Sequence, residues 1–130
     1  MRIISFNSRG LGGVEKSRYL RDIIRKKEVD MACIQETKMA IITREKCQSI
    51  WGDNNIDWLH NGEENGAAGI LSVWNKNNFT LLKSKSGKGY IIIEGEWGEN
   101  KQLVTIVNVY SPCTFSEKKV LWEELIKSRG

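Results

Sequence analysis

The first 35 residues contain a short apolar run, an amphipathic segment and a second apolar run. Arg2–Phe6 and Val29–Gln35 are apolar enough to predict buried strands. Between them a helix is predicted from Val14, because apolar residues recur on one face and basic residues lie mostly on the other. The apolar face comprises Tyr19, Leu20, Ile23 and Ile24. A strand, a helix and a strand in this order favour two parallel strands joined by a crossover helix.

The rest of the chain predicts a second helix, a series of strands and a final helix. The second helix is expected from about Thr43 to Trp51. Gly, Asn and Lys clusters then separate several apolar segments, which is typical of successive strands. These strands are expected at Asp57–His60, Ala67–Trp74, Phe79–Lys83, Gly89–Trp97 and Leu103–Tyr110. The final helix is expected from Ser116 to Lys127. No segment has the composition of a linker, so residues 1–130 are expected to belong to one α/β domain.

Composition adds a few exclusions to this picture. Hydrophobic residues make up 40% and charged residues 28% of the 130 residues, which fits an ordinary globular domain. Because no apolar run approaches the roughly 20 residues that span a bilayer, we expect an intracellular protein with no membrane partner. The 20 basic and 16 acidic residues give a net charge of +4, which mildly favours anionic partners such as nucleic acid. The 3 cysteines and the single histidine make no usual zinc motif, so reduced and buried thiols are expected.

Three polar residues each follow a predicted apolar strand. They are Asn7, Glu36 and Tyr110. In open α/β sheets, functional groups gather beyond the carboxyl ends of the strands, so these three are expected to converge. The Glu36 carboxylate suits Mg²⁺, the Asn7 amide can donate and accept hydrogen bonds, and the Tyr110 phenol can orient a phosphate or a water. Taken singly, each residue is a poor signal, because a polar residue after a strand is usually part of an ordinary solvated turn.

Three sequence strings resemble a known family. The strings are ISFNSRGL (4–11), DMACIQETK (30–38) and VNVYSP (107–112), and their order and spacing resemble the endonuclease/exonuclease/phosphatase superfamily. The resemblance covers nearly the whole chain and implies a four-layer α/β sandwich of the DNase-I-like kind. Shorter stretches at 49–52, 70–74 and 121–125 are most similar to the endonuclease domain of plant LINE-type retrotransposons.

The resemblance implies a role for four residues. Glu36 would bind a divalent metal, Mg²⁺ or Mn²⁺, while Asn7 and Tyr110 would be catalytic residues near the scissile phosphate. Arg9, together with Asn7 and Tyr110, would contact nucleic acid. The implied reaction is metal-assisted hydrolysis of a phosphodiester in DNA. The implied setting is the nucleus, with a reverse transcriptase domain encoded downstream.

Two motifs of the family do not occur in the 130 residues. They are the later G-D-x-N and S-D-H motifs, and the single histidine, His60, matches no family position. Since those motifs flank the phosphate and supply the base, we expect this chain to be the N-terminal half of such a domain, truncated after its first half. We expect it to be inactive alone, and whether it is an enzyme by itself stays open. The alternatives are a phosphatase of inositol lipids or other small phosphates on the same fold, and a non-catalytic nucleic-acid-binding remnant.

Overall fold

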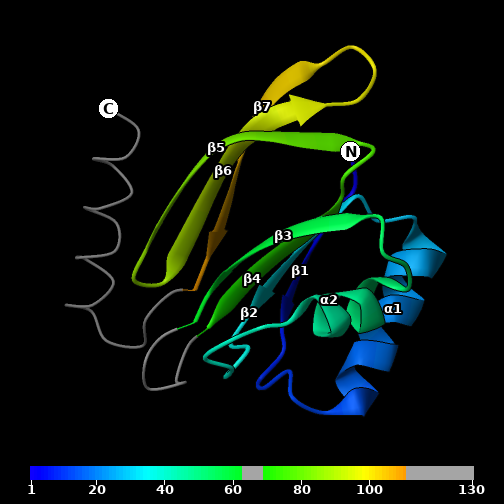
Figure 1. Ribbon diagram of the computed structural model, residues 1–130, viewed down its shortest axis with the longest axis vertical. Helices are drawn as coiled ribbons and strands as arrows, with labels where there is room; N and C mark the ends of the chain where they lie inside the picture. The colour runs from blue at the N-terminus through cyan, green and yellow to red at the C-terminus, as the bar shows by residue number, and fades with distance from the viewer. Residues whose placement is uncertain (63–68, 111–130) are drawn as a thin grey trace.

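A computed structural model describes residues 1–62 and 69–110 and arranges them in three layers (Figure 1). Two helices cover one face of a four-stranded sheet, and a three-stranded sheet packs against its other face. The helices are α1 (Val14–Lys27) and α2 (Arg44–Trp51). The strands are β1 (Ile3–Asn7), β2 (Met31–Gln35), β3 (Ile56–Asn61), β4 (Ile70–Asn75), β5 (Phe79–Gly87), β6 (Tyr90–Trp97) and β7 (Gln102–Val109). The helix expected at 116–127 lies outside the described residues.

The strand pairing confirms the predicted opening of the fold. The four-stranded mixed sheet has the order β1-β2-β4-β3, and its β1–β2 pair is parallel, with α1 as the crossover helix. The β2–β4 and β3–β4 pairs are antiparallel. The three-stranded meander sheet has the order β5-β6-β7 and is antiparallel throughout. The chain therefore has the predicted α/β class, with helices on one side of two stacked sheets.

At β2 both faces of the mixed sheet are buried, so this strand is a nearly continuous apolar run rather than an alternating one. Successive side chains point to opposite faces of a strand. Ala32 and Ile34 accordingly pack toward the helices, whereas Met31 and Cys33 pack toward the meander sheet. The core between the two sheets also includes Ile70, Trp74, Phe79, Ile91, Ile93 and Ile106.

Local backbone conformation and capping hydrogen bonds explain where α1 ends and where α2 begins. α1 ends at Glu28, a left-handed residue whose N–H donates to the Arg25 carbonyl oxygen at 3.3 Å. α2 begins after Thr43, whose hydroxyl accepts a hydrogen bond from the Lys46 N–H at 3.1 Å. Over residues 1–62 and 69–110, neither helix is long and apolar enough to cross a membrane.

Two local details differ from the sequence-based expectation. Helical spacing predicts Tyr19 on the buried face of α1, but this prediction is wrong, because the side chain is 56% exposed, with its ring beside Phe6 of the edge strand β1. Ser17 takes a buried position on α1 instead. β5 continues beyond the expected Lys83 to Gly87, since its polar residues gain backbone hydrogen bonds from the apolar strand β6.

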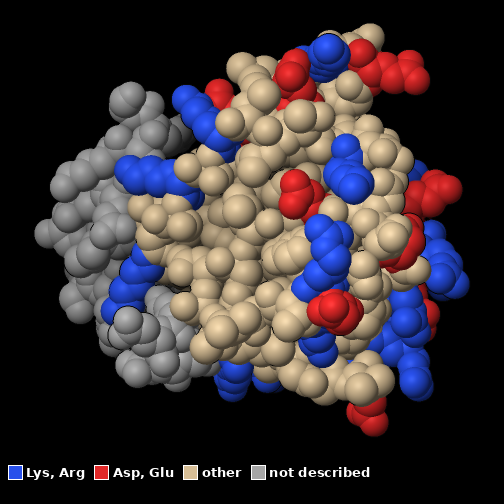
Figure 2. Space-filling model, in the orientation of Figure 1, with Lys and Arg blue, Asp and Glu red and all other residues tan. Residues whose placement is uncertain are grey.

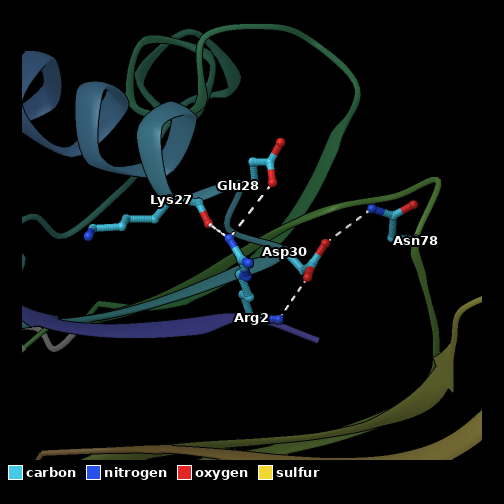
Figure 3. Close-up of polar contacts among 5 residues, drawn as sticks. All are labelled: Arg2, Lys27, Glu28, Asp30 and Asn78. Atoms are coloured by element: carbon cyan, nitrogen blue, oxygen red, sulfur yellow. Dashed lines mark hydrogen bonds and ion pairs between the residues drawn. The ribbon is translucent and has the colours of Figure 1, made fainter.

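A polar cluster joins the amino ends of β1 and β2, at the edge opposite the strand ends singled out above (Figure 3). Asp30 accepts a hydrogen bond from the Arg2 N–H at 2.7 Å and another from the Asn78 side-chain amide at 3.2 Å. The Arg2 guanidinium donates to the Lys27 carbonyl oxygen at 2.8 Å, at the end of α1. Its contact with Glu28 is longer, 3.8 Å, and both side chains are solvated, so that pair adds little stability.

Replacing Asp30 by alanine is expected to lower the free energy of unfolding by about 1 to 2 kcal/mol, because two hydrogen bonds to a partly buried carboxylate are lost. Urea denaturation followed by tryptophan fluorescence measures this change. The matched control is Asp22→Ala, on an exposed part of α1, which should leave stability nearly unchanged. Equal effects of the two substitutions would contradict a structural role for the cluster.

The two described cysteines are buried, as expected, and are predicted to be unreactive. Burial raises the pKa of Cys33 to about 11 and that of Cys47 to about 12, so thiolate is scarce near neutral pH. In a Cys113→Ser variant, Ellman's reagent at about pH 8 should therefore detect no rapidly reacting thiol until denaturant is added. A fast reaction of the native variant would contradict this burial.

Candidate functional site

The carboxyl ends of β1 and β2 lie side by side, as their parallel pairing requires. Asn7, the last residue of β1, is the register partner of Gln35, the last residue of β2. The two segments stay together beyond the strands through three backbone hydrogen bonds of 2.8 to 2.9 Å. These bonds join Ser8 N–H to Gln35 O, Gly10 N–H to Glu36 O, and Leu11 N–H to Thr37 O. The half-buried Glu36 is therefore held against the loop that follows the exposed Asn7.

Left-handed non-glycine residues gather in these two facing segments. Arg9, Glu36 and Lys38 have φ values of 51°, 51° and 53°. Each such residue costs about 1 kcal/mol relative to an ordinary conformation. The Asn7 side-chain oxygen accepts the Arg9 N–H at 3.1 Å and supports the first of them. Backbone strain of this kind persists where the surroundings fix the chain, and it concentrates at functional sites.

Thr37, a buried residue next to Glu36, connects the segment after β2 to β3 and to the residue before β4 through hydrogen bonds. The Thr37 N–H donates to the Gly69 carbonyl oxygen at 2.9 Å, and the Thr37 hydroxyl lies 3.2 Å from His60 Nε2. A Cβ at Gly69 would collide with the Thr37 hydroxyl oxygen, so glycine allows this close approach. His60 is half-buried, and burial lowers its pKa.

A buried amide pair brings β7 to the same sheet edge. Gln35 Nε2 donates to Asn108 Oδ1 at 2.9 Å, across the boundary between the two sheets. Tyr110 follows Asn108 by two residues, and its N–H donates to the Gly89 carbonyl oxygen at 2.9 Å. The structure thus brings the end of β7, which carries Tyr110, to the edge formed by the ends of β1 and β2.

Basic groups lie close to this edge. Arg9 and Lys38 are exposed in the two facing segments, and the Lys16 ammonium donates a hydrogen bond to the Ser8 carbonyl oxygen. On the face of the molecule in Figure 2, Lys and Arg side chains are interspersed with Asp and Glu rather than joined in one patch. The basic groups near Glu36 therefore include Arg9 and Lys38 of these two segments and Lys16 of α1.

The donor set at this edge fits a hard cation. Glu36 supplies a carboxylate and Asn7 an amide oxygen, and Mg²⁺ prefers oxygen ligands, commonly one or two carboxylates with several waters. Within the described part of the chain, no three His, Cys, Asp or Glu side chains gather closely enough to enclose a metal ion. Glu36 and Asn7 would supply only part of a Mg²⁺ coordination shell, and waters would complete it.

The sequence matches no protein-family model and no curated protein. Solved structures do match the fold. AP endonuclease LMAP from Leishmania major has a TM-score of 0.62 at 14% identity, with 92% of this chain and 43% of that chain covered. D. rerio TDP2, in complex with a single-strand DNA product, has a TM-score of 0.62 at 15% identity, with 95% and 52% covered. ANGEL2, described as a 2',3'-cyclic phosphatase, has a TM-score of 0.56 at 11% identity, with 85% and 40% covered.

This chain thus spans about half the length of the solved structures it matches. At these identities the likeness shows the fold alone. The described layers are those of the expected DNase-I-like α/β sandwich, shared with an AP endonuclease and with a phosphatase.

Sequence reasoning identified the strand ends but missed the residues that hold them in place. Asn7, Glu36 and the strand bearing Tyr110 come to one edge, and Arg9 lies exposed beside them. Gln35 and Asn108 belong to the motif strings, yet no structural role was predicted for them. Their signal was available, since each is a polar residue at a strand position whose neighbours on the same face are apolar.

Acid is expected to destabilise the chain through His60. Its pKa lies below the usual 6.5 in the folded state, so the unfolded state binds the proton first as pH falls. The free energy of unfolding should therefore decrease as pH falls below 6.5, and His60→Gln, which retains a donor toward Thr37, should show a smaller decrease. Urea denaturation at about pH 7.5 and about pH 5.5 measures both proteins. Parallel losses in the two proteins would show that His60 is not responsible.

Proposed function

We propose that this chain is the first half of a divalent-metal-dependent phosphodiesterase domain that cleaves DNA. More specifically, we propose the endonuclease of a LINE-type retrotransposon, acting in the nucleus with a reverse transcriptase domain encoded downstream. The observation that carries the proposal is the meeting of three strand ends, which bear Asn7, Glu36 and Tyr110, at one edge of the sandwich. The sequence strings around these three residues support the finer assignment.

The chemistry of the described residues suits binding and orientation of a phosphodiester. Glu36 and Asn7 would hold Mg²⁺ or Mn²⁺, and the bound ion would stabilise negative charge that develops on the phosphoryl oxygens. Arg9 is exposed beside them and would pair with the DNA backbone. The Tyr110 phenol would donate to a phosphate oxygen and fix its orientation. These roles bind and position the substrate, and the group that activates water would come from a second half.

Two open sheet edges support the half-domain proposal. In the described residues, β1 is one of the two outer strands of the mixed sheet and β7 is one of the two outer strands of the meander sheet. A cavity of about 350 Å³ lies between these two strands. Ile3 on β1 is 43% exposed and Val107 on β7 is 46% exposed. Unpaired edges with exposed apolar residues are unusual for a finished sandwich, because such edges invite further strand pairing. We propose that strands of a second half extend both sheets there.

A phosphatase acting on small phosphates is the second candidate. The likeness to ANGEL2, described as a 2',3'-cyclic phosphatase, favours it, because the same fold serves that reaction. The two candidates share the metal-binding edge and differ in the substrate. Release of inorganic phosphate from small phosphate esters distinguishes the phosphatase from an enzyme that nicks DNA.

Glu36→Gln is expected to weaken Mn²⁺ binding by at least about tenfold, because the only carboxylate proposed as a ligand loses its charge. Electron paramagnetic resonance of free Mn²⁺ during titration with the 130-residue chain measures the affinity directly. The matched control is Glu15→Gln, in the first turn of α1, which should bind as the wild type does. Equal binding by the Glu36 and Glu15 variants would contradict the metal role.

A plasmid-nicking assay with Mg²⁺ on the same proteins tests the half-domain part. Metal binding without nicking by the wild-type chain is the expected result. Nicking that disappears both in Glu36→Gln and in EDTA would support the hydrolase proposal while contradicting the need for a second half.

A further inference from the structure

We infer that Gln35 and Asn108 form a positioning clasp, which sets where the segments carrying Glu36 and Tyr110 lie relative to each other. The inferred consequence for catalysis rests on the proposed function, but the clasp itself does not. Gln35 directly precedes Glu36, and Asn108 precedes Tyr110 by two residues. A single hydrogen bond of 2.9 Å therefore joins the two strand ends that bear candidate groups, although 73 residues separate them in the sequence.

Both amides are buried, and both have hydrogen-bond partners inside the protein: Gln35 Nε2 donates to the Cys33 carbonyl oxygen at 3.1 Å as well as to Asn108. Gln35 is 8% exposed and Asn108 is 1% exposed. The Asn108 Nδ2 group donates to the Leu71 carbonyl oxygen at 2.9 Å and to the Ser72 hydroxyl at 3.0 Å. The Asn108 Oδ1 atom accepts from Gln35, so each end of this amide has a defined partner. Both amides are thus fixed in one orientation.

The same network reaches β1. Gln35 Nε2 lies 3.1 Å from the Ser5 hydroxyl oxygen, and Ser5 stands two residues before Asn7 on the same face of β1. Gln35 thus contacts β1 and β7 from its position on β2, and Asn108 contacts β4. Of these four strands, β1 ends in Asn7, β2 is directly followed by Glu36, and β7 is directly followed by Tyr110. One buried polar network therefore touches each strand whose end forms the site.

The surroundings of the amide pair indicate that its hydrogen bond fixes the position of β7 on β2 rather than adding much stability. Around the amide pair the core between the two sheets is apolar, with Met31, Ile70 and Ile106 nearby, and another side-chain hydrogen bond between the sheets joins Asn61 to Gly87, away from the ends of β2 and β7. Apolar contacts are non-directional and allow one layer to shift on the other, whereas a hydrogen bond between buried amides has one favourable geometry. A buried amide pair contributes little more stability than a well-packed apolar pair. Its distinctive effect is to fix the position of β7 on β2.

Fluorine NMR on the whole chain labelled with 3-fluorotyrosine tests the clasp without any metal or substrate. The chain has 3 tyrosines, so three resonances are expected, and Tyr110→Phe assigns one of them. Gln35→Met and Asn108→Leu break the same hydrogen bond from opposite sides with little change in volume. Both are expected to shift or broaden the Tyr110 resonance, and the Tyr90 resonance is not used as a control because Tyr90 packs against Val109 at the same strand end. An unchanged Tyr19 resonance, from α1, and native tryptophan fluorescence report that the chain is folded.

Two further variants keep this test decisive. Ser72→Ala removes a hydroxyl from the network but leaves the Gln35–Asn108 hydrogen bond, and it should leave the Tyr110 resonance unchanged. If an apolar variant loses all three native resonances, Gln35→Asn replaces it, because this change keeps a buried amide but shortens it by one methylene. An unchanged Tyr110 resonance in folded clasp variants would overturn the inference, since apolar packing alone would then set the position of β7.

Adding Mn²⁺ to the same samples separates the clasp from the proposed function. In the wild type, Mn²⁺ should broaden the Tyr110 resonance, and Glu36→Gln should abolish that broadening. In the clasp variants, the Tyr110 resonance is expected to lose most of the metal-induced broadening. If Mn²⁺ has no Glu36-dependent effect in the wild type while the clasp variants still shift Tyr110, the proposed metal function fails and the clasp stands.

Discussion

Two parallel strands joined by a helix must end at the same edge of their sheet, and the rest of this molecule is arranged around that constraint. The β1–α1–β2 unit puts Asn7 beside Gln35, and backbone hydrogen bonds then carry the pairing past the strands as far as Thr37. Glu36 cannot move away from the loop after Asn7 without breaking those bonds. The candidate site is therefore a direct consequence of the crossover topology and requires no long loop to assemble it.

Burial of β2 on both of its faces is the second constraint. The helices cover one face and the meander sheet covers the other, so every residue of β2 is buried. A polar side chain on such a strand must find a partner inside the protein, because an unpaired buried amide costs about 1 to 3 kcal/mol. Gln35 meets this requirement with Asn108 of the opposite sheet. The need to satisfy one buried group thus links the ends of two sheets that apolar contacts alone would hold less specifically.

Hydrophobic periodicity was enough to predict most of the fold, because burial determines which residues alternate. It predicted the crossover, both described helices and the succession of strands along the chain. It did not predict the order of the strands within each sheet. It failed where another interaction outweighs hydrophobicity: Tyr19 stays exposed beside Phe6, and the polar end of β5 forms a strand because β6 offers it hydrogen bonds. Candidate site residues could be predicted at strand ends. The apolar neighbours of their supports, Gln35 and Asn108, could have indicated that these two residues are buried, but their pairing with each other was not predictable, since it depends on how two sheets stack.

The left-handed conformation of Glu36 shows why those supports matter. A glutamate in this region pays a local energy penalty of about 1 kcal/mol, so a free loop would relax to another conformation. Here the carbonyl group of Glu36 accepts the Gly10 N–H, and the next residue is held by Gly69 and His60. Gln35, on the other side, is held by Asn108. The residue that carries the candidate ligand is thus restrained on both sides by neighbours that cannot relax independently. Such restraint reduces the entropy that a bound cation and phosphate would otherwise have to remove, which is the physical advantage of building the site on strand ends.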